Sequence, residues 1–359
     1  MIDFRYHLVS LISVFLALAV GIVLGAGPLK EAIGDTLTGE VEALRSRATD
    51  LRTEADAVSA ELARTNAAFD EAGDDLLADL LGARNIAIVE VGGVHPTVLT
   101  RVGERIEQAG GTITATVHLE VAWIDPARRA FRQSIAGTLV DYLDPEPAVG
   151  SGVEVELAEA LAQGLTTGVP EDPEELAESA GAVLDVLVEG GLIRVQQPVT
   201  APADAVVMLV GPATEPVEPG DDGEVDAEAS EQVEAWLTAG VELAVAAQVR
   251  SSGLVVAGVD ASEGGLLADL RSNVRTVTRV STVSAVDTVA GELSVPTALA
   301  SRIAGTVGQF GPEPDATAAF PSRTVLAPIV RVPVDPVDET EGDSETDDDA
   351  DGGDEGASG

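Results

Sequence analysis

An uncharged apolar run near the N-terminus constrains this chain more than any other feature. Residues 8–27, LVSLISVFLALAVGIVLGAG, contain no Asp, Glu, Lys or Arg. As a helix this run would be about 30 Å long, which is the hydrocarbon thickness of a bilayer. The alternative is a cleaved signal peptide, but its apolar region is shorter, and Pro28 is a poor residue after a cleavage site. We therefore predict a single transmembrane anchor at 8–27.

The residues around this anchor bear on its orientation and packing. Arg5 precedes it and Lys30 follows it, so the positive-inside rule gives little help. Residues 1–7 form a short tail that is easily left in the cytoplasm. We expect a single-pass protein of the cell membrane with an extracytoplasmic globular part. Within the anchor, Gly21 and Gly25 have the spacing that lets two membrane helices approach closely.

Residues 29–80 carry a heptad pattern. From residue 37 to residue 76, apolar positions recur at alternating steps of four and three residues. An ordinary amphipathic helix would let its apolar face drift over this length, whereas a coiled coil keeps the face in line. The larger side chains of this row, which we call the seam, are Leu37, Val41, Leu44, Leu51, Val58, Leu62, Phe69 and Leu76. We predict a coiled-coil stalk that pairs with a second copy of the chain, or else with a complementary helix of another protein.

Short apolar strands alternate with helices after the stalk. This alternation is typical of a parallel sheet covered on both faces, and it predicts a doubly wound, Rossmann-like α/β domain at 84–311. The predicted strands are 85–91, 112–119, 205–210, 254–259 and 276–280, and the predicted helices are 97–108, 154–165, 173–187, 230–249 and 264–271. Residues 312–359 are predicted to be a linker and a disordered acidic tail.

The charge balance excludes one class of partner. The chain has 62 acidic and 20 basic residues, a net charge of −42. Binding to nucleic acid requires clustered Lys and Arg that neutralise phosphates, so we expect no nucleic-acid partner.

The ends of the predicted strands are where an open parallel sheet would bind a ligand. The candidates there, which we call the crest residues, are Gly92, Gly93, His95 and Asp260. The dinucleotide spacing G-x-G-x-x-G and the phosphate loop G-x-x-x-x-G-K-[ST] are absent, and a glycine turn after a first strand is more often only a tight turn. His118 lacks identified partners and is interpreted as structural. No catalytic motif occurs, so we predict no catalytic residue and no cofactor.

Two stretches of the sequence resemble a known family. The opening MIDFRYHLVSL, which runs on as VFLALAVGIVLGAGPL, resembles the start of the actinobacterial MctB family, which includes the corynebacterial envelope protein SteB. The segment SAVDTVAG at 284–291 is similar to the family's V-D-T-x-x-G segment. The resemblance covers residues 1 to about 310 and leaves the acidic tail outside.

The resemblance implies two roles. One is copper homeostasis through efflux across the outer membrane, and the alternative is a scaffold of envelope integrity and cell division that acts with the membrane protein SteA. One spanning helix cannot form a pore alone, so a pore would need an oligomer. The chain has no Cys, two Met and three His, while Cu(I) prefers thiolate or thioether and Cu(II) prefers imidazole. We therefore predict no metal site in this membrane-anchored, non-enzymatic protein.

Overall fold

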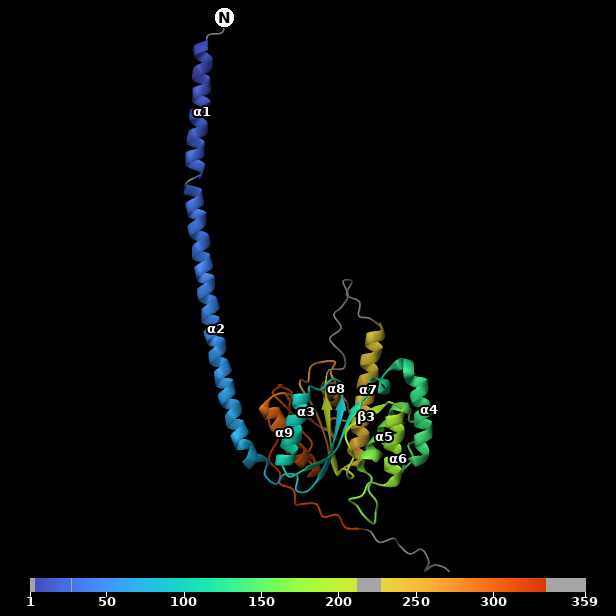
Figure 1. Cartoon of the computed structure of the whole chain (residues 1–359). Helices are drawn as coiled ribbons and strands as arrows, with labels where there is room; N and C mark the ends of the chain where they lie inside the picture. Colours follow the sequence, from blue (N-terminus) through green and yellow to red (C-terminus); the bar gives the residue numbers. More distant parts are fainter. Residues whose placement is uncertain (1–3, 27, 212–226, 334–359) are drawn as a thin grey trace, which may run out of the picture. The chain divides into compact units, whose positions relative to one another are not determined.

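The computed structural model describes residues 4–26, 28–211 and 227–333, and it describes their side chains except at 25–26, 28–38 and 227–229 (Figure 1). Gly25, Leu37 and the predicted acidic tail therefore lie outside the described side chains. The chain divides into two units, 1–68 and 69–359.

The N-terminal unit consists of helices α1 (Phe4–Ala26) and most of α2 (Pro28–Leu77). Among the described residues, α1 is the one helix long and apolar enough to cross a membrane, over Phe4–Leu24. It begins four residues before the predicted start at residue 8 and includes Phe4, Arg5, Tyr6 and His7. Aromatic rings such as Phe4 and Tyr6 are suited to the headgroup layer.

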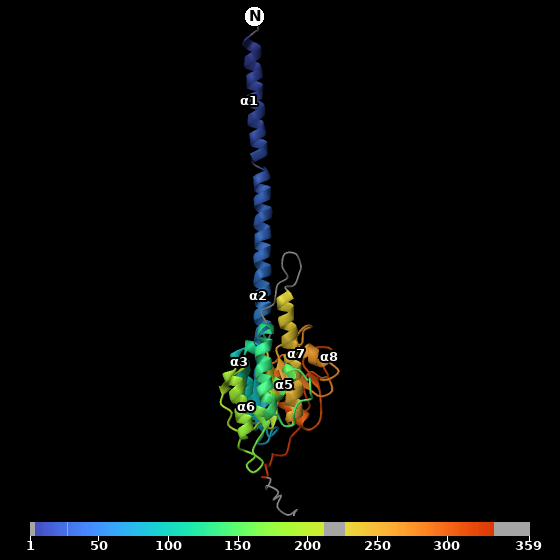
Figure 2. The same cartoon turned by 90° about the vertical axis from the view of Figure 1, so that its right-hand side faces the viewer.

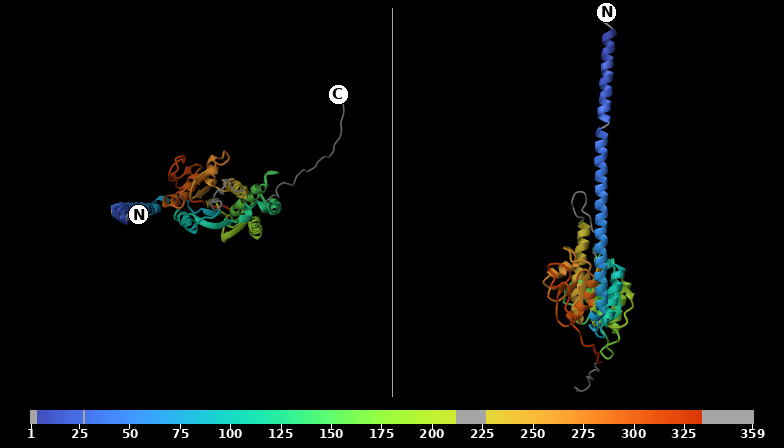
Figure 3. Two further views of the ribbon diagram at one scale, coloured as in Figure 1. Left: turned by 90° about the horizontal axis from the view of Figure 1, so that it is seen from above. Right: turned by 90° about the vertical axis from the view of Figure 1, so that its left-hand side faces the viewer.

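The predicted stalk is one unbroken helix, as Figure 3 shows for α2. Its seam is exposed to solvent from Val41 to Phe69, and Leu44, Leu51, Val58 and Leu62 are each about 60% exposed. This row of large apolar side chains therefore has no apolar partner among the residues that the structure describes. Pairing of this helix into a coiled coil stays a prediction.

The C-terminal unit is built on one sheet, with the strand order β3-β2-β1-β4-β5-β6-β7 among the described residues. Its strands are β1 (Asn85–Val91), β2 (Thr112–Leu119), β3 (Ile193–Gln197), β4 (Ala205–Val210), β5 (Leu254–Gly258), β6 (Ser281–Val283) and β7 (Gln309–Phe310). All neighbouring strands are parallel except β2 and β3. The prediction of a parallel sheet is therefore confirmed in the main, with one antiparallel edge strand.

Helices cover both faces of this sheet. One apolar cluster packs beneath α4 (Arg129–Leu139), α5 (Val153–Thr166), α6 (Glu178–Glu189), α7 (Ala227–Arg250) and α8 (Leu266–Ser272). The other packs beneath α3 (Pro96–Gln108), α9 (Val289–Ile303) and the end of α2. Figure 2 shows α5 between α6 and α7. Short 3-10 turns η1 (Val121–Trp123), η2 (Pro126–Arg128) and η3 (Val140–Tyr142) flank α4.

Two predicted elements differ from the structure. Residues 276–280 are not a strand: 274–279 form turns, and the Thr276 hydroxyl donates to the carbonyl of Leu270 at 2.7 Å. The helix predicted at 173–187 begins only at Glu178, because Leu176 forms a β-bridge with Gly168. Helices α4 and α9 and strands β3, β6 and β7 were not predicted.

The last turns of α2 belong to the α/β unit. Leu77 is fully buried, whereas the seam residue Leu76 beside it is partly exposed. Arg323 donates to the carbonyl of Leu76 at 2.9 Å and to that of Ala78 at 2.8 Å, which satisfies the end of the helix. Arg323 lies in the stretch predicted as a linker, and this stretch also pairs Arg331 with Asp204.

Candidate functional site

The ends of β1 and β4 meet where a doubly wound sheet usually opens a ligand crevice. Gly92 follows β1 in the left-handed region, with φ +78°, which glycine adopts without strain. Its neighbour Gly93 lies against Gly211, which follows β4. A Cβ on Gly211 would lie 2.4 Å from the carbonyl carbon of Gly93. The turn after β1 therefore packs with its backbone directly on the end of β4.

The other two crest residues make local contacts. His95 caps α3, and its Nδ1 accepts a hydrogen bond from the backbone N–H of Thr97 at 3.3 Å. Asp260 accepts from both the hydroxyl and the backbone N–H of Ser262, and these bonds lower the pKa of Asp260. Neither His95 nor Asp260 lines the cavity that Gly92 and Gly93 border.

A cavity of about 240 Å³ lies one strand away, at the ends of β1 and β2. We call it the crest cavity; it is lined by Val91, Gly92, Gly93, His118, Leu119, Glu120, Val121, Ile124 and Trp236. Two of the four predicted crest residues, Gly92 and Gly93, therefore border a cavity. Trp236 of α7 was missed, since nothing in the sequence connects α7 with the turn after β1.

The two carboxylates near the crest cavity have partners, whereas Nδ1 of His118 and Nε1 of Trp236 have no hydrogen-bond partner among the described residues. Glu90 is 6% exposed, and its carboxylate accepts from the side chain of Gln196. His118 is opposite Glu90 in the sheet, with Nδ1 3.3 Å from Oε2, but this contact lacks hydrogen-bond geometry. It is therefore an ion pair only when the imidazole is protonated. Glu120 pairs with Arg194 at 2.8 Å.

The family-like segment SAVDTVAG forms the start of α9. The Thr288 hydroxyl accepts from the backbone N–H of Gly291 at 3.1 Å and donates to the carbonyl of Ala285 at 2.8 Å. A Cβ on Gly291 would lie 2.0 Å from that carbonyl oxygen. Thr288 therefore caps α9, and Gly291 fits where a larger residue has no room.

The helix that this segment begins carries a buried carboxylate. Glu292 is 1% exposed and lies 3.1 Å from Arg101 and 3.7 Å from Arg105, both on α3. Arg105 also pairs with Asp70 near the end of α2. These charges connect α9, α3 and the last turns of α2 in one network.

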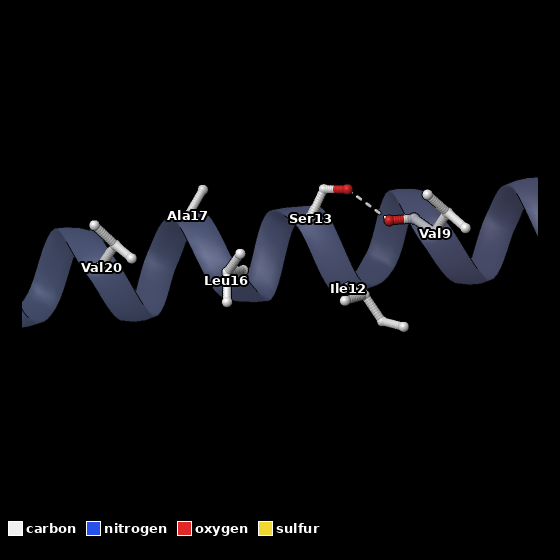
Figure 4. Close-up of a pocket in the computed structure, with 6 residues that line it drawn as sticks. All are labelled: Val9, Ile12, Ser13, Leu16, Ala17 and Val20. Atoms are coloured by element: carbon white, nitrogen blue, oxygen red, sulfur yellow. Dashed lines mark hydrogen bonds between the residues drawn. The ribbon is translucent and has the colours of Figure 1, made fainter.

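A shallow hollow of about 420 Å³ lies along one face of α1 (Figure 4). Its residues are Val9, Ile12, Ser13, Leu16, Ala17 and Val20. The Ser13 hydroxyl donates to the carbonyl of Val9 at 2.6 Å, so its polar group is satisfied within the helix. Ser13 and Ala17 extend the four-residue spacing of Gly21 toward the N-terminus. This face is suited to lipid or to a second membrane helix.

No three side chains of His, Cys, Asp or Glu lie close enough to hold a metal ion within the part of the chain that the structure describes.

The apolar helix and the sheet define a membrane-associated α/β protein. The chain belongs to the MctB family: the family model described as "Copper transport outer membrane protein, MctB" matches residues 1–321. The copper transporters MctB of Mycobacterium tuberculosis and Mycobacterium bovis are each 27% identical over 323 residues, covering 87% of this chain and 96% of the relative. The copper transporter MctB of Mycobacterium leprae is 26% identical over 326 residues, with the same coverage. The resemblance of the opening stretch is thus confirmed.

Proposed function

We propose that this chain is a non-enzymatic, membrane-anchored subunit in copper homeostasis that works as an assembly of several copies. The support for copper is the family description and the names of the relatives. The support for an assembly, and the observation that carries the proposal, is the exposed seam of α2. Copies anchored by α1 in one bilayer meet in parallel, so their seams face each other in register.

An assembly would also explain how a chain with few copper ligands can act in copper homeostasis. The sequence contains no Cys, two Met and three His, so tight chelation by one chain is disfavoured. One apolar helix cannot enclose a path for ions, because every backbone polar group in lipid must be satisfied internally. Several helices can surround such a path. In this proposal α1 lines or supports the path, and the α/β domain lies outside the cytoplasm.

A second function has one observation in its favour. The seam of α2 is equally suited to a complementary helix of another envelope protein. In that case the chain is a scaffold of envelope integrity and cell division, with a partner like SteA. The four relatives matched here carry the copper-transporter name and not the scaffold name.

The test compares seam variants with matched variants on the same helix. Leu51→Asp with Leu62→Asp places two charges in the seam, and Ala57→Asp with Ala60→Asp places the same charges on its outer side. Each form is expressed in a strain that lacks the protein. Cellular copper content, copper tolerance and chemical crosslinking between two tagged copies are then measured.

The two functions predict different outcomes. An assembly in copper homeostasis requires that the seam variant lose crosslinking between copies and raise copper content, while the control behaves as wild type. Unchanged copper content in the deletion strain itself would rule out the copper function. Loss of a different captured envelope protein, with copper content unchanged, would support the scaffold.

A further inference from the structure

We infer that the crest cavity binds a small, neutral, planar aromatic molecule that carries a hydrogen-bond acceptor, such as an aromatic amide. This inference is independent of the copper role. It rests on the walls of the cavity, on one unpartnered donor and on the charge balance at its rim.

The walls of the crest cavity fit one flat ring. Val91 and Leu119 are buried at the ends of β1 and β2, and Ile124 closes the side after η1. An apolar cavity of about 150 Å³ is large enough to bind benzene. A volume of about 240 Å³ therefore has room for one ring with a small substituent. Drug-sized ligands need larger sites.

Trp236 supplies the unpartnered donor. The residue is 3% exposed, it lines the cavity, and its Nε1–H has no hydrogen-bond acceptor. A buried donor without a partner costs about 1–3 kcal/mol. Nε1 has no accessible surface of its own, so a small rotation of the indole is needed before a carbonyl oxygen in the cavity reaches it. That oxygen would then provide the missing acceptor, while the ligand's ring would contact the indole and the aliphatic wall.

The charges at the rim favour a neutral ligand. The carboxylate of Glu120 is already paired with Arg194, and that of Glu90 with the amide of Gln196. A charged ligand would lose its hydration without an unpaired counter-ion in the cavity.

The experiment uses the full chain in phosphatidylcholine nanodiscs and three probes. Benzamide has both a ring and an acceptor, benzene has only the ring, and acetamide has only the acceptor. Saturation-transfer NMR, with empty nanodiscs as the blank, reports binding. Tryptophan fluorescence in a Trp123→Phe background reports whether the probe reaches Trp236.

Two variants with a matched control decide the result. Trp236→Phe keeps a ring but removes the N–H, and should weaken benzamide about 2- to 10-fold while leaving benzene unchanged. Ile124→Phe fills the cavity and should abolish binding of both aromatic probes. Val188→Phe adds the same ring at an exposed position of α6 and should bind as wild type. Circular dichroism verifies that each variant is folded.

The inference is overturned if wild-type protein binds benzamide no more than empty nanodiscs do. It is also overturned if Ile124→Phe binds as well as Val188→Phe, since the probe would then lie elsewhere. If Trp236→Phe does not fold, the comparison of Ile124→Phe with Val188→Phe still decides the site, and acetamide binding as strong as benzamide binding would refute the aromatic class.

Discussion

Gly291 lies at a position where a side chain has no room. Its Cα faces the carbonyl of Ala285, which a Cβ would approach to 2.0 Å. We expect Gly291→Ala to lower the free energy of unfolding by at least about 1–3 kcal/mol, the usual cost of overpacking. Denaturant unfolding of the full chain in detergent, followed by circular dichroism, measures this.

Gly137 provides the matched control. It lies within α4, and a Cβ there would meet no atom within 4 Å. Gly137→Ala should therefore raise the stability, by about 0.5–1 kcal/mol, because alanine is the better helix former. Equal effects at Gly137 and Gly291 would contradict the close approach to Ala285.

Glu313 gives the α/β unit a dependence on pH. Burial raises the pKa of this carboxyl, but hydrogen bonds from Ser284 at 2.7 Å and from Arg271 at 3.2 Å outweigh it, so the pKa is lowered. A lowered pKa in the folded state stabilises the protein above the ordinary pKa of about 4.3, and this contribution is lost as the pH falls through the folded value. Wild type should therefore lose more stability than Glu313→Gln between pH 6 and pH 3.

Thermal unfolding midpoints at a series of pH values test this prediction. Glu263→Gln, in an exposed loop, is the control and should follow the wild-type profile. A Glu313→Gln profile parallel to that of wild type would show that the bonds to Ser284 and Arg271 contribute nothing to the acid response.

Some residues of the crest cavity could be predicted from the sequence and others could not. Gly92 and Gly93 were predicted at the sheet end because they follow an apolar strand directly. Trp236 was not, because it reaches the cavity only through the packing of α7 on the sheet. His95 and Asp260 follow strands as predicted, but their side chains form hydrogen bonds with Thr97 and Ser262. Such local hydrogen bonds cannot be inferred from the position of a residue after a strand.

The junction between α2 and the α/β unit depends on Glu292. Its carboxylate is buried beside Arg101 and Arg105, and Arg105 also holds Asp70 of α2. Glu292→Gln should cost about 1–3 kcal/mol, because the hydrogen bond from Arg101 loses its charged acceptor and the two arginines lose their shared counter-ion. It should also speed amide hydrogen exchange in residues 69–77.

Hydrogen exchange with mass spectrometry tests this junction. Glu189→Gln, at the exposed end of α6, is the control and should leave exchange in residues 69–77 as in wild type. If Glu292→Gln leaves that exchange unchanged, the network does not hold the end of α2 on the domain.

The charges beside the seam of α2 allow self-association to be distinguished from binding to another protein. In a parallel coiled coil, the residue directly before every second seam position lies opposite a residue of the partner helix. That residue is five positions further along the sequence. This aligns Glu40 with Arg45, an attraction, and Arg47 with Arg52, a repulsion. Arg47→Glu should therefore strengthen self-association, by about 0.2–1 kcal/mol for each of two pairs.

Crosslinking between differently tagged copies measures that change. Arg64→Glu, on the outer side of the helix, is the control and should have no effect. The gain should disappear in 1 M salt, where exposed charges are screened. Weaker crosslinking by Arg47→Glu would instead favour a partner helix with acidic residues beside its seam.

Elements with one strong pattern were predicted well, and those with mixed signals were not. The apolar strands β1, β4 and β5 match their predictions because burial on both faces leaves a continuous run. Helix α9 was missed because it contains Pro296 and has Gly291 in its first turn, both poor helix signals whose cost tertiary packing offsets. Strand β3, IRVQQ, is a polar edge without such a run.

At the scale of the whole molecule, the charge of −42 is compatible with the proposed position of the α/β unit outside the cytoplasm. Acidic residues contribute little to orientation, so the charge does not oppose export of the α/β unit. A highly charged surface keeps a domain soluble on a crowded membrane face. The order of apolar helix, long helix and sheet could be predicted because each has its own sequence pattern. The partners of the chain could not be predicted, since the exposed seam fits more than one helix.

The orientation of the chain in the membrane can be tested by thiol labelling, because the sequence contains no cysteine. A single introduced thiol is therefore the only target of a maleimide. Val149→Cys, at a fully exposed position between η3 and α5, should react with a membrane-impermeant maleimide in intact spheroplasts. Asp3→Cys, in the N-terminal tail, should react only after the membrane is permeabilised. The reverse pattern would place the α/β unit in the cytoplasm, and with it the proposed assembly would face the wrong side for copper leaving the cell.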